Sequence, residues 1–157
     1  MNVALLNRDT LYHSFLNGAK EVIQQKKILN ELNVFPVPDG DTGSNLSSMM
    51  YTILEEAKVG NTTKETLQSI ADAALIGARG NSGIIFAQYI SGMLETFPNE
   101  EEITLEDFVT IAEGGVAYAY QAISNPVEGT MITVMKDWAL ALKSLKGQTK
   151  DFVEAFV

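Results

Sequence analysis

The sequence predicts an all-α fold, and three observations support this prediction. Apolar residues recur at helical spacing through most of the chain, and no segment shows the strict alternation of a half-buried strand. The connections between these segments are short and either polar or rich in Gly and Pro, which favours antiparallel neighbouring helices. At 157 residues, of which 46% are hydrophobic, the chain is long enough for a single domain, residues 1–157, with a substantial core.

Helices are expected in regular succession along the chain. In the first, Tyr12, Phe15 and Leu16 begin an apolar stripe with helical spacing. The segments Thr62 to Glu65 and Thr104 to Asp107 have the spacing of capping boxes, which mark the starts of two later helices. The expected helices cover residues 8–29, 44–58, 63–77, 82–97, 105–123, 131–145 and from about 149 onward.

The charge balance limits the classes of partner. The chain has 20 acidic and 11 basic residues, which gives a formal net charge of −9. Nucleic-acid backbones are held by clusters of lysine and arginine, so this composition argues against nucleic acid as a partner. An acidic protein that binds a polyphosphate needs cations between the two, so any such function requires Mg²⁺ or a similar ion.

Other features bear on cellular context. With no cysteine, the chain has no disulfide framework, thiolate nucleophile or zinc cluster of the usual kind. The longest apolar run, residues 84–90, is too short for a transmembrane segment and contains Gln88. The first nine residues lack a basic region followed by an apolar one, so no signal peptide is recognised and a cytoplasmic location is expected.

Residues 33–45, with the sequence NVFPVPDGDTGSN, predict a site for a hard metal ion. Two prolines stiffen the chain before Asp39, and Gly40 lets the backbone bend between Asp39 and Asp41. Mg²⁺ is usually held by one or two carboxylates together with substrate phosphates. An EF-hand is excluded, because a loop starting at Asp39 lacks Gly at its sixth place and Glu at its twelfth. For the Asp-Gly-Asp triplet alone, an ordinary turn is an equally good interpretation.

Two further loops contain glycine. In residues 77–83, GARGNSG, the N–H groups of the helix that follows and the hydroxyl of Ser82 could hold a phosphate, although helix packing is the better interpretation of this loop alone. Arg79 could stabilise charge on a transferring phosphoryl group, with pairing to an acid as the alternative. Residues 125–131 end one helix and begin another at Thr130, and alone they indicate an ordinary helix connection.

Taken together, residues 32–45, 77–83 and 126–131 resemble the ATP-binding domain of the dihydroxyacetone kinase L-subunit family. The closest resemblance is to the fatty acid kinase branch of this family, whose N-terminal domain binds ATP, and it spans essentially the whole chain. It implies a barrel of antiparallel amphipathic helices that binds ATP or ADP and two Mg²⁺ ions at one rim. Three acidic side chains commonly hold the metals in this family. Here the resemblance assigns that role to Asn33, Asp39 and Asp41, with Asn33 at a position that is usually acidic.

The resemblance also implies which residues contact the nucleotide and take part in catalysis. Catalytic roles fall to Asp39, Asp41 and Arg79. The implied nucleotide contacts are Thr42, Gly43, Ser44 and Asn45 in the first motif, Gly80, Asn81, Ser82 and Gly83 in the second, and Thr130 and Met131 in the third.

The function implied by this resemblance is that of a kinase. ATP- and Mg²⁺-dependent transfer of the γ-phosphoryl group would go to a fatty acid carboxylate that a separate fatty-acid-binding protein presents. A carboxylate is already a nucleophile and needs no general base, which suits a chain without an obvious one. A dihydroxyacetone kinase of the L-subunit type, a non-catalytic Mg²⁺-nucleotide sensor and a helical interaction domain remain as alternatives.

Residues 151–157 stop within an amphipathic pattern that has no cap or breaker. The family resemblance implies at least one further helix, so the chain is expected to be truncated at its C-terminus. An open helical barrel exposes an apolar stripe, and monomeric soluble proteins rarely tolerate a large one. Self-association, and weak or absent catalysis by this fragment alone, are therefore expected.

Overall fold

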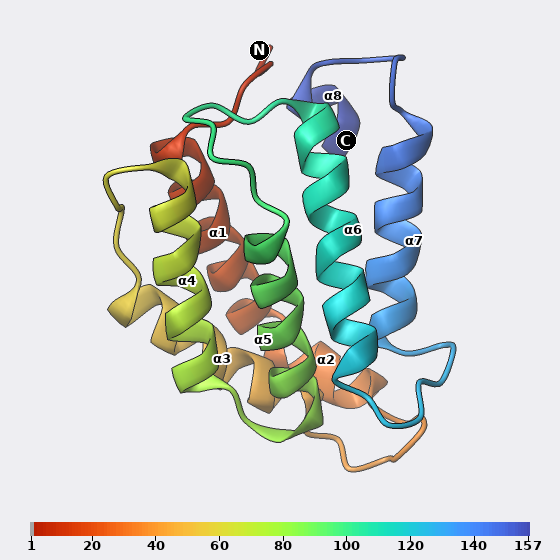
Figure 1. The fold of residues 1–157 in the computed structure, drawn as a ribbon. Helices are drawn as coiled ribbons and strands as arrows, with labels where there is room; N and C mark the ends of the chain where they lie inside the picture. Colours follow the sequence, from red (N-terminus) through yellow and green to blue (C-terminus); the bar gives the residue numbers. More distant parts are fainter. Residues whose placement is uncertain (1) are drawn as a thin grey trace.

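The computed structural model describes residues 2–157, which fold into helices joined by loops (Figure 1). Within these residues the β-type pairing is limited to one isolated antiparallel bridge between Leu6 and Ile103. The all-α prediction is therefore confirmed. Across the same residues, no helix has the length and apolar character needed to cross a membrane. The helices are α1 (Arg8–Gln24), α2 (Lys26–Leu32), α3 (Thr42–Glu56), α4 (Thr63–Gly77), α5 (Gly80–Glu95), α6 (Leu105–Gln121), α7 (Met131–Ser144) and α8 (Phe152–Phe156).

Side-chain hydrogen bonds cap the starts of α1, α4, α6 and α8, and the sequence predicts those of α4 and α6. At α6, Thr104 Oγ1 accepts a hydrogen bond from the N–H of Asp107 at 3.2 Å, and the Asp107 carboxylate accepts one from the N–H of Thr104 at 2.9 Å. The predicted capping box is therefore present. At α4 only half of the predicted box forms. Thr62 Oγ1 accepts from the N–H of Glu65 at 3.0 Å, whereas the Glu65 carboxylate accepts from the N–H of Asn61 at 2.8 Å.

The prediction of one continuous helix over residues 8–29 is wrong. The chain breaks at Gln25, with φ −87° and ψ 5°, and α2 then packs across the start of α3. Gly43 permits this crossing, since a Cβ there would lie 2.1 Å from the carbonyl oxygen of Lys26. The break therefore reflects tertiary packing, because the segment has no proline and no glycine at the break.

The other helices match their predicted positions with small shifts at the ends. Helices α3 and α5 begin at residues 42 and 80, whereas the expected starts are 44 and 82. The last helix, α8, begins at residue 152 after a short loop, and not at about 149. Differences of one or two residues at helix ends are usual for assignments from sequence patterns.

Helices α4, α5, α6 and α7 lie side by side and run alternately in opposite directions (Figure 1). Helix α3 packs on α1, α4 and α5, and α1 also contacts α4, so the helices share one apolar core. Burial of such side chains is the main term that favours folding. The largest fully buried apolar side chains are those of Met49, Ile53, Leu67, Ile70, Ile90, Ile103, Ile111, Ile132 and Leu142.

Helices α5 and α6 approach each other closely because three contact positions are glycine. A Cβ at Gly92 would lie 2.4 Å from the carbonyl oxygen of Gly114, and a Cβ at Gly115 would lie 2.8 Å from the ring of Tyr89. Both distances are shorter than a carbon atom can accept, so larger residues would push the helices apart. Gly114 and Gly115 lie outside the three sequence motifs, and the sequence predicted no role for them.

The two ends of the chain meet at one end of the molecule. The N–H of Val3 donates to the Asp151 carboxylate at 2.9 Å, and the N–H of Phe152 donates to the carbonyl of Val3 at 2.8 Å. The Phe152 ring then packs edge-on against Phe108, with ring centroids 5.8 Å apart. These contacts fasten α8 to α6 and leave the opposite end of the helices to the loops that carry the motifs.

Candidate nucleotide and metal site

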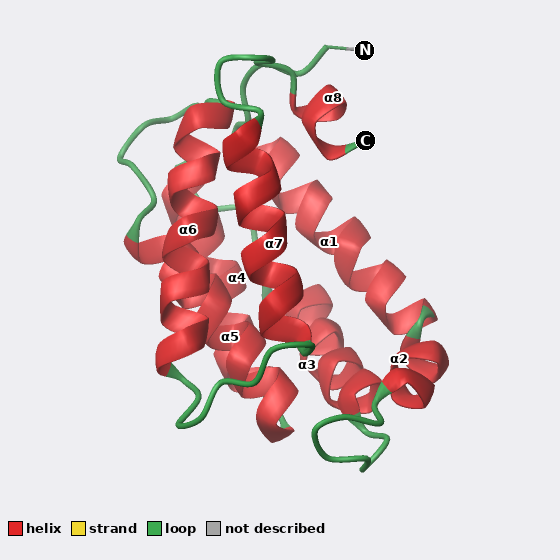
Figure 2. Ribbon diagram, turned by 90° about the vertical axis from the view of Figure 1, so that its right-hand side faces the viewer, coloured by secondary structure: helices red, strands yellow, loops and turns green. Residues whose placement is uncertain are grey.

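The three sequence motifs lie together at the end of the molecule opposite the two chain termini (Figures 1 and 2). The first motif approaches both of the others. Gly80 is so close to Asn45 that a Cβ would lie 2.3 Å from Asn45 Nδ2, and Cε1 of Phe35 lies 4.0 Å from the position of a Cβ on Gly129. Loops that are far apart in the sequence therefore form one rim.

The two acidic residues of the first motif are both exposed. Gly40 between them has φ +63°, a backbone conformation that side-chain-bearing residues rarely adopt, so glycine is required at this bend. No side-chain hydrogen bond or ion pair among residues 2–157 involves the carboxylate of Asp39 or Asp41. The oxygens of both carboxylates are accordingly available to a cation.

Asn33 organises the loop that carries these acids. Its Oδ1 atom accepts hydrogen bonds from the N–H groups of Asp41 at 3.0 Å and Thr42 at 3.1 Å. Its Nδ2 atom donates to the carbonyl of Val37 at 3.0 Å. The side chain thus joins the end of α2 to the start of α3, and its role as a metal ligand stays a prediction.

The first turn of α3 is already capped by side chains from α2. Asn30 Oδ1 accepts from the N–H of Ser44 at 2.9 Å, and Asn30 Nδ2 donates to Ser44 Oγ at 3.0 Å. The N–H groups of Thr42 and Ser44 are therefore occupied, although the first N–H groups of a helix have no partner within the helix itself. Gly43 is buried against α2, and Asn45 faces Gly80.

The start of α5 is a helix N-terminus of the rim that no side chain caps. Its N-cap residue, Arg79, provides no side-chain cap, and Gly80 has φ +60°. Within the described chain the N–H groups of Gly80, Asn81 and Ser82 have no hydrogen-bond acceptor, whereas Gly83 N–H bonds to the carbonyl of Arg79 at 3.1 Å. The Ser82 hydroxyl is buried and also lacks a partner. Free N–H groups at a helix start favour an anion such as phosphate.

Arg79 lies next to this helix start. Its guanidinium donates to the carbonyl of Ala78 at 2.8 Å and to that of Ile76 at 3.3 Å, at the C-terminal end of α4. No acid of residues 2–157 forms an ion pair with it, so the alternative of a structural pairing has no support. The cation is held where helix carbonyls carry partial negative charge and beside the uncapped donors of α5.

The third loop is fastened by Glu128. Its carboxylate accepts hydrogen bonds from Lys136 at 2.8 Å, Thr133 at 2.8 Å and Tyr120 at 3.2 Å, which ties the loop to α6 and α7. The hydrogen bond from Lys136, followed by that from Thr133, holds the pKa of Glu128 below its usual value. The sequence motifs gave Glu128 no role, although its spacing from Thr133 and Lys136 is compatible with a contact to the first turns of a following helix.

Thr130 and Met131 lie where the third loop enters α7. Thr130 is the N-cap residue, as the breakers before it predict, but its hydroxyl donates to the carbonyl of Val127 at 2.8 Å and does not cap the helix. Gly129 before it has φ +85°, so the turn requires glycine. Both Thr130 and Met131 are half-buried at the rim.

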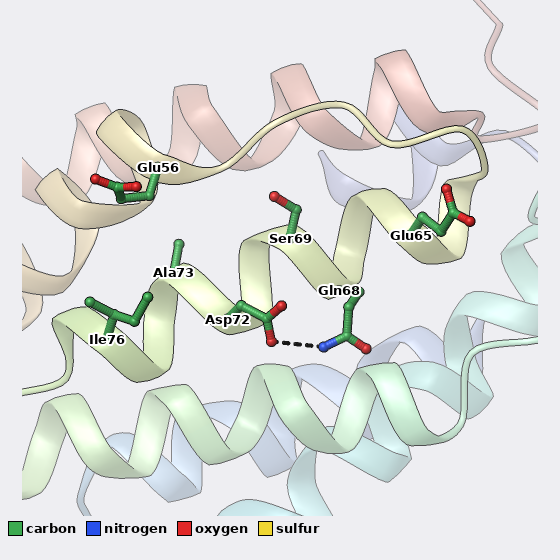
Figure 3. A pocket seen from close by; sticks show the side chains of 7 residues that line it. All are labelled: Glu56, Glu65, Gln68, Ser69, Asp72, Ala73 and Ile76. Atoms are coloured by element: carbon green, nitrogen blue, oxygen red, sulfur yellow. Dashed lines mark hydrogen bonds between the residues drawn. The ribbon is translucent and has the colours of Figure 1, made fainter.

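A hollow of about 360 Å³ lies away from this rim, between the end of α3 and the outer face of α4 (Figure 3). It contains three carboxylates, of Glu56, Glu65 and Asp72, and none of the predicted site residues. The Asp72 carboxylate accepts a hydrogen bond from Gln68 at 2.8 Å. Across residues 2–157, no group of three His, Cys, Asp or Glu side chains has an arrangement that could hold a metal, so this hollow is a solvated acidic surface.

The rim residues fit Mg²⁺ together with a phosphate better than they fit a metal ion alone. Asp39 and Asp41 provide two hard oxygen ligands, which is the number that Mg²⁺ commonly takes from a protein when phosphates provide others. The orphaned hydroxyl of Ser82 and the free N–H groups beside it match the phosphate. The donor set of the rim is thus compatible with a magnesium ion that carries a polyphosphate.

The chain is similar to a known domain family and to several bacterial proteins. A family model described as the DAK2 domain matches residues 36–157. An uncharacterised protein of Staphylococcus epidermidis is 34% identical over 157 residues, which cover 99% of this chain and 28% of that protein. The YloV protein of Bacillus subtilis is 37% identical over 141 residues, or 88% of this chain and 26% of YloV. An uncharacterised Staphylococcus aureus protein is 35% identical over 155 residues, or 97% of this chain and 28% of that protein.

The chain therefore spans little more than a quarter of the length of these relatives. The family match covers all three motifs from Pro36 onward and most of the helical core. The chain belongs to the DAK2 domain family, the nucleotide-binding modules of dihydroxyacetone kinase L-subunit type.

Proposed function

We propose that this domain binds Mg²⁺-ATP at the rim and serves as the phosphoryl-donor half of a kinase. The observation that carries the proposal is the contact between the first and second motifs. Asn45, in the first turn after the Asp39–Asp41 bend, lies against Gly80 at the uncapped start of α5. A metal held by the carboxylates and a phosphate held by the helix N-terminus would therefore be neighbours.

Different residues of the rim bind the metal, orient the phosphates and stabilise the transferring charge. When bound, Mg²⁺ neutralises phosphate charge, which a protein with a net charge of −9 requires. Asp39 and Asp41 hold the ions, while the N–H groups from Gly80 to Ser82 and the Ser82 hydroxyl orient the phosphates. Arg79 adds a positive charge where phosphoryl transfer develops negative charge. Thr130 and Met131 lie on the side of the rim that would receive the base.

A fatty acid carboxylate, presented by a separate acyl-binding protein, is the acceptor that we propose. Such an acceptor is itself a nucleophile, so the domain needs to supply position and charge but no general base. The first and third loops are exposed for most of their length, which suits an acceptor presented by another protein. Relatives of this domain are between three and four times as long, so the activity of a whole protein is part of the proposal.

Calorimetric titration of ATP with and without Mg²⁺ tests the binding step. We expect binding that requires Mg²⁺ and that is lost in Asp39→Asn and in Asp41→Asn, with unchanged helical content. Asp72→Asn, which removes an exposed carboxylate outside the three motifs, is the matched control and should bind like the parent. Equal binding by the parent, Asp39→Asn and Asp41→Asn would show that the metal site is elsewhere.

Turnover tests the kinase step. Radiolabelled ATP is incubated with the domain and an acyl-loaded fatty-acid-binding protein, and in parallel with dihydroxyacetone bound to its own carrier protein. Transfer to the fatty acid carboxylate alone supports the proposal. Transfer to dihydroxyacetone alone would place the domain in the dihydroxyacetone kinase branch of the family. Mg²⁺-ATP binding without transfer in either reaction, for a protein that includes the regions present in the longer relatives, would favour a nucleotide sensor.

A further inference from the structure

The side chain of Asn33 uses its hydrogen-bonding capacity on the backbone of its own loop. Its Oδ1 atom accepts from two N–H groups, those of Asp41 and Thr42, at 3.0 and 3.1 Å, and its Nδ2 atom donates to Val37 at 3.0 Å. An amide oxygen has two lone pairs, and both are directed at these donors. A metal could approach this oxygen only after the hydrogen bonds that shape the turn were broken.

The same three bonds fix the position of the two acids. They connect residue 33, where α2 ends, with residue 37 in the middle of the loop and residues 41 and 42, where α3 begins. The Asp39–Asp41 bend is thus held across its base by one planar side chain. Rigid support of this kind lowers the ordering cost when a metal binds.

An asparagine within α2 makes similar bonds to the start of α3. Asn30 lies in the last turn of α2, three residues before Asn33, which is the C-cap residue of this helix. Asn30 bonds to both the N–H and the hydroxyl of Ser44, in the first turn of α3. Helix α2, separated from α1 by the break at Gln25, and its C-cap residue Asn33 therefore present two amides to the start of α3. This contact gives the separate short helix a structural role in supporting the rim.

We infer that Asn33 is a positioning residue that holds the Asp39–Asp41 bend, and that the protein ligands of the metal are the two carboxylates alone. This inference rests on the proposed function, because it concerns the metal that accompanies the nucleotide. It assigns Asn33 a role through its hydrogen bonds, where the position in the motif had predicted direct coordination. Phosphate oxygens and water then complete the coordination of the ion.

Substitution by cysteine distinguishes a side chain that coordinates the metal from one that only supports the loop. The chain has no cysteine, so Asn33→Cys, Asp39→Cys and Asp41→Cys each introduce a single thiol. A thiolate in a ligand position shifts metal preference from Mg²⁺ towards a soft ion such as Cd²⁺. ADP affinity is measured by calorimetry with Mg²⁺ and with Cd²⁺ for each variant and the parent.

We expect Asn33→Cys to weaken Mg²⁺-supported ADP binding by about 10–100-fold, as loss of a supporting residue does, with no recovery in Cd²⁺. Asp39→Cys and Asp41→Cys should lose binding in Mg²⁺ and recover it in Cd²⁺. Recovery of Asn33→Cys by Cd²⁺ would overturn the inference and leave the proposed function intact. Undiminished Mg²⁺-supported binding by Asp39→Cys and Asp41→Cys would instead refute the proposed function.

Amide exchange provides a readout that does not depend on whether a thiolate binds well. In the parent, the N–H protons of Asp41 and Thr42 should exchange slowly with solvent, and they should remain slow after Mg²⁺-ADP is added. In Asn33→Cys both protons should exchange faster, while the melting temperature of the protein stays unchanged. Faster exchange of both protons in the parent on addition of Mg²⁺-ADP would show that Asn33 leaves them to bind the metal, and would overturn the inference.

Discussion

Replacement of Gly80 by alanine tests the contact between the first two motifs. Gly80 has φ +60°, and a Cβ there would lie 2.3 Å from Asn45 Nδ2. The backbone conformation costs an alanine about 1–2 kcal/mol, part of which is offset by the lower entropy of the unfolded chain. The contact itself is relieved when the Asn45 side chain swings away, so it perturbs the rim more than it perturbs the fold.

Gly147→Ala is the matched control for this variant. Gly147 has φ +81°, so it carries the same kind of conformational cost, but nothing lies within 4 Å of its Cβ position. A net loss of about 1 kcal/mol lowers the melting temperature of a chain of this size by about 2–4 °C. We expect this decrease in both variants, measured by circular dichroism.

The two variants should differ in nucleotide binding. We expect Gly80→Ala to weaken Mg²⁺-ADP binding on the order of tenfold, which corresponds to about 1.4 kcal/mol, and Gly147→Ala to bind like the parent. Calorimetric titration at a temperature well below both transitions measures this difference. Equal affinities in Gly80→Ala and Gly147→Ala would refute the reasoning, since the contact with Asn45 would then have no part in the nucleotide site.

Three further predictions concern stability and association. Gly92→Ala should lower the free energy of unfolding, measured in urea, by about 1–3 kcal/mol, because the new Cβ would lie 2.4 Å from the carbonyl oxygen of Gly114. Gly18→Ala is the control, since nothing lies within 4 Å of its Cβ position, and it should raise the same free energy by about 0.5–1 kcal/mol. Glu128→Gln should melt below the parent at neutral pH. The pKa of Glu128 is lower in the folded protein than its ordinary value of 4.5, so its contribution is present above pH 4.5 and is lost as the pH falls through the folded value. The melting difference should therefore vanish in acid; a constant difference down to pH 2 would contradict this. The chain should also self-associate through the exposed apolar side chains of α7, such as Val134, which is 69% exposed, and a concentration-independent monomer mass in light scattering would exclude this.

The rim combines two loops that internal hydrogen bonds hold in place with a helix start whose N–H groups lack hydrogen-bond partners. The first loop is held by Asn33 and the third by Glu128, so both keep their shape through contacts within the protein. The start of α5 between them keeps free N–H groups and the orphaned hydroxyl of Ser82. Unsatisfied polar groups next to rigid supports are characteristic of binding sites, because the ligand completes the hydrogen bonds without a large ordering cost.

Much of this arrangement can be predicted from local sequence. Helical periodicity and the absence of alternating segments indicate the all-α class, and Thr104 and Asp107 mark the start of α6 by a contact within one turn. The bend at Gly40 is local as well, since its positive φ is a property of that residue and its neighbours. Such features depend on residues a few positions apart, so a pattern in the sequence is sufficient to find them.

Only the tertiary structure decides the features that depend on contacts between distant segments. The break at Gln25 exists because α2 crosses α3 at Gly43, and the close approach of α5 and α6 depends on Gly92 meeting Gly114. Likewise, Asn33 is a plausible metal ligand by its place in the motif, but its hydrogen bonds to Asp41 and Thr42 arise from the path of the whole loop. The sequence by itself thus determined the helices, the acidic turn and the chemistry of the rim residues. Packing between helices decided which of those residues face one another and which bond to the backbone, because interatomic distances between remote segments are set by the core as a whole.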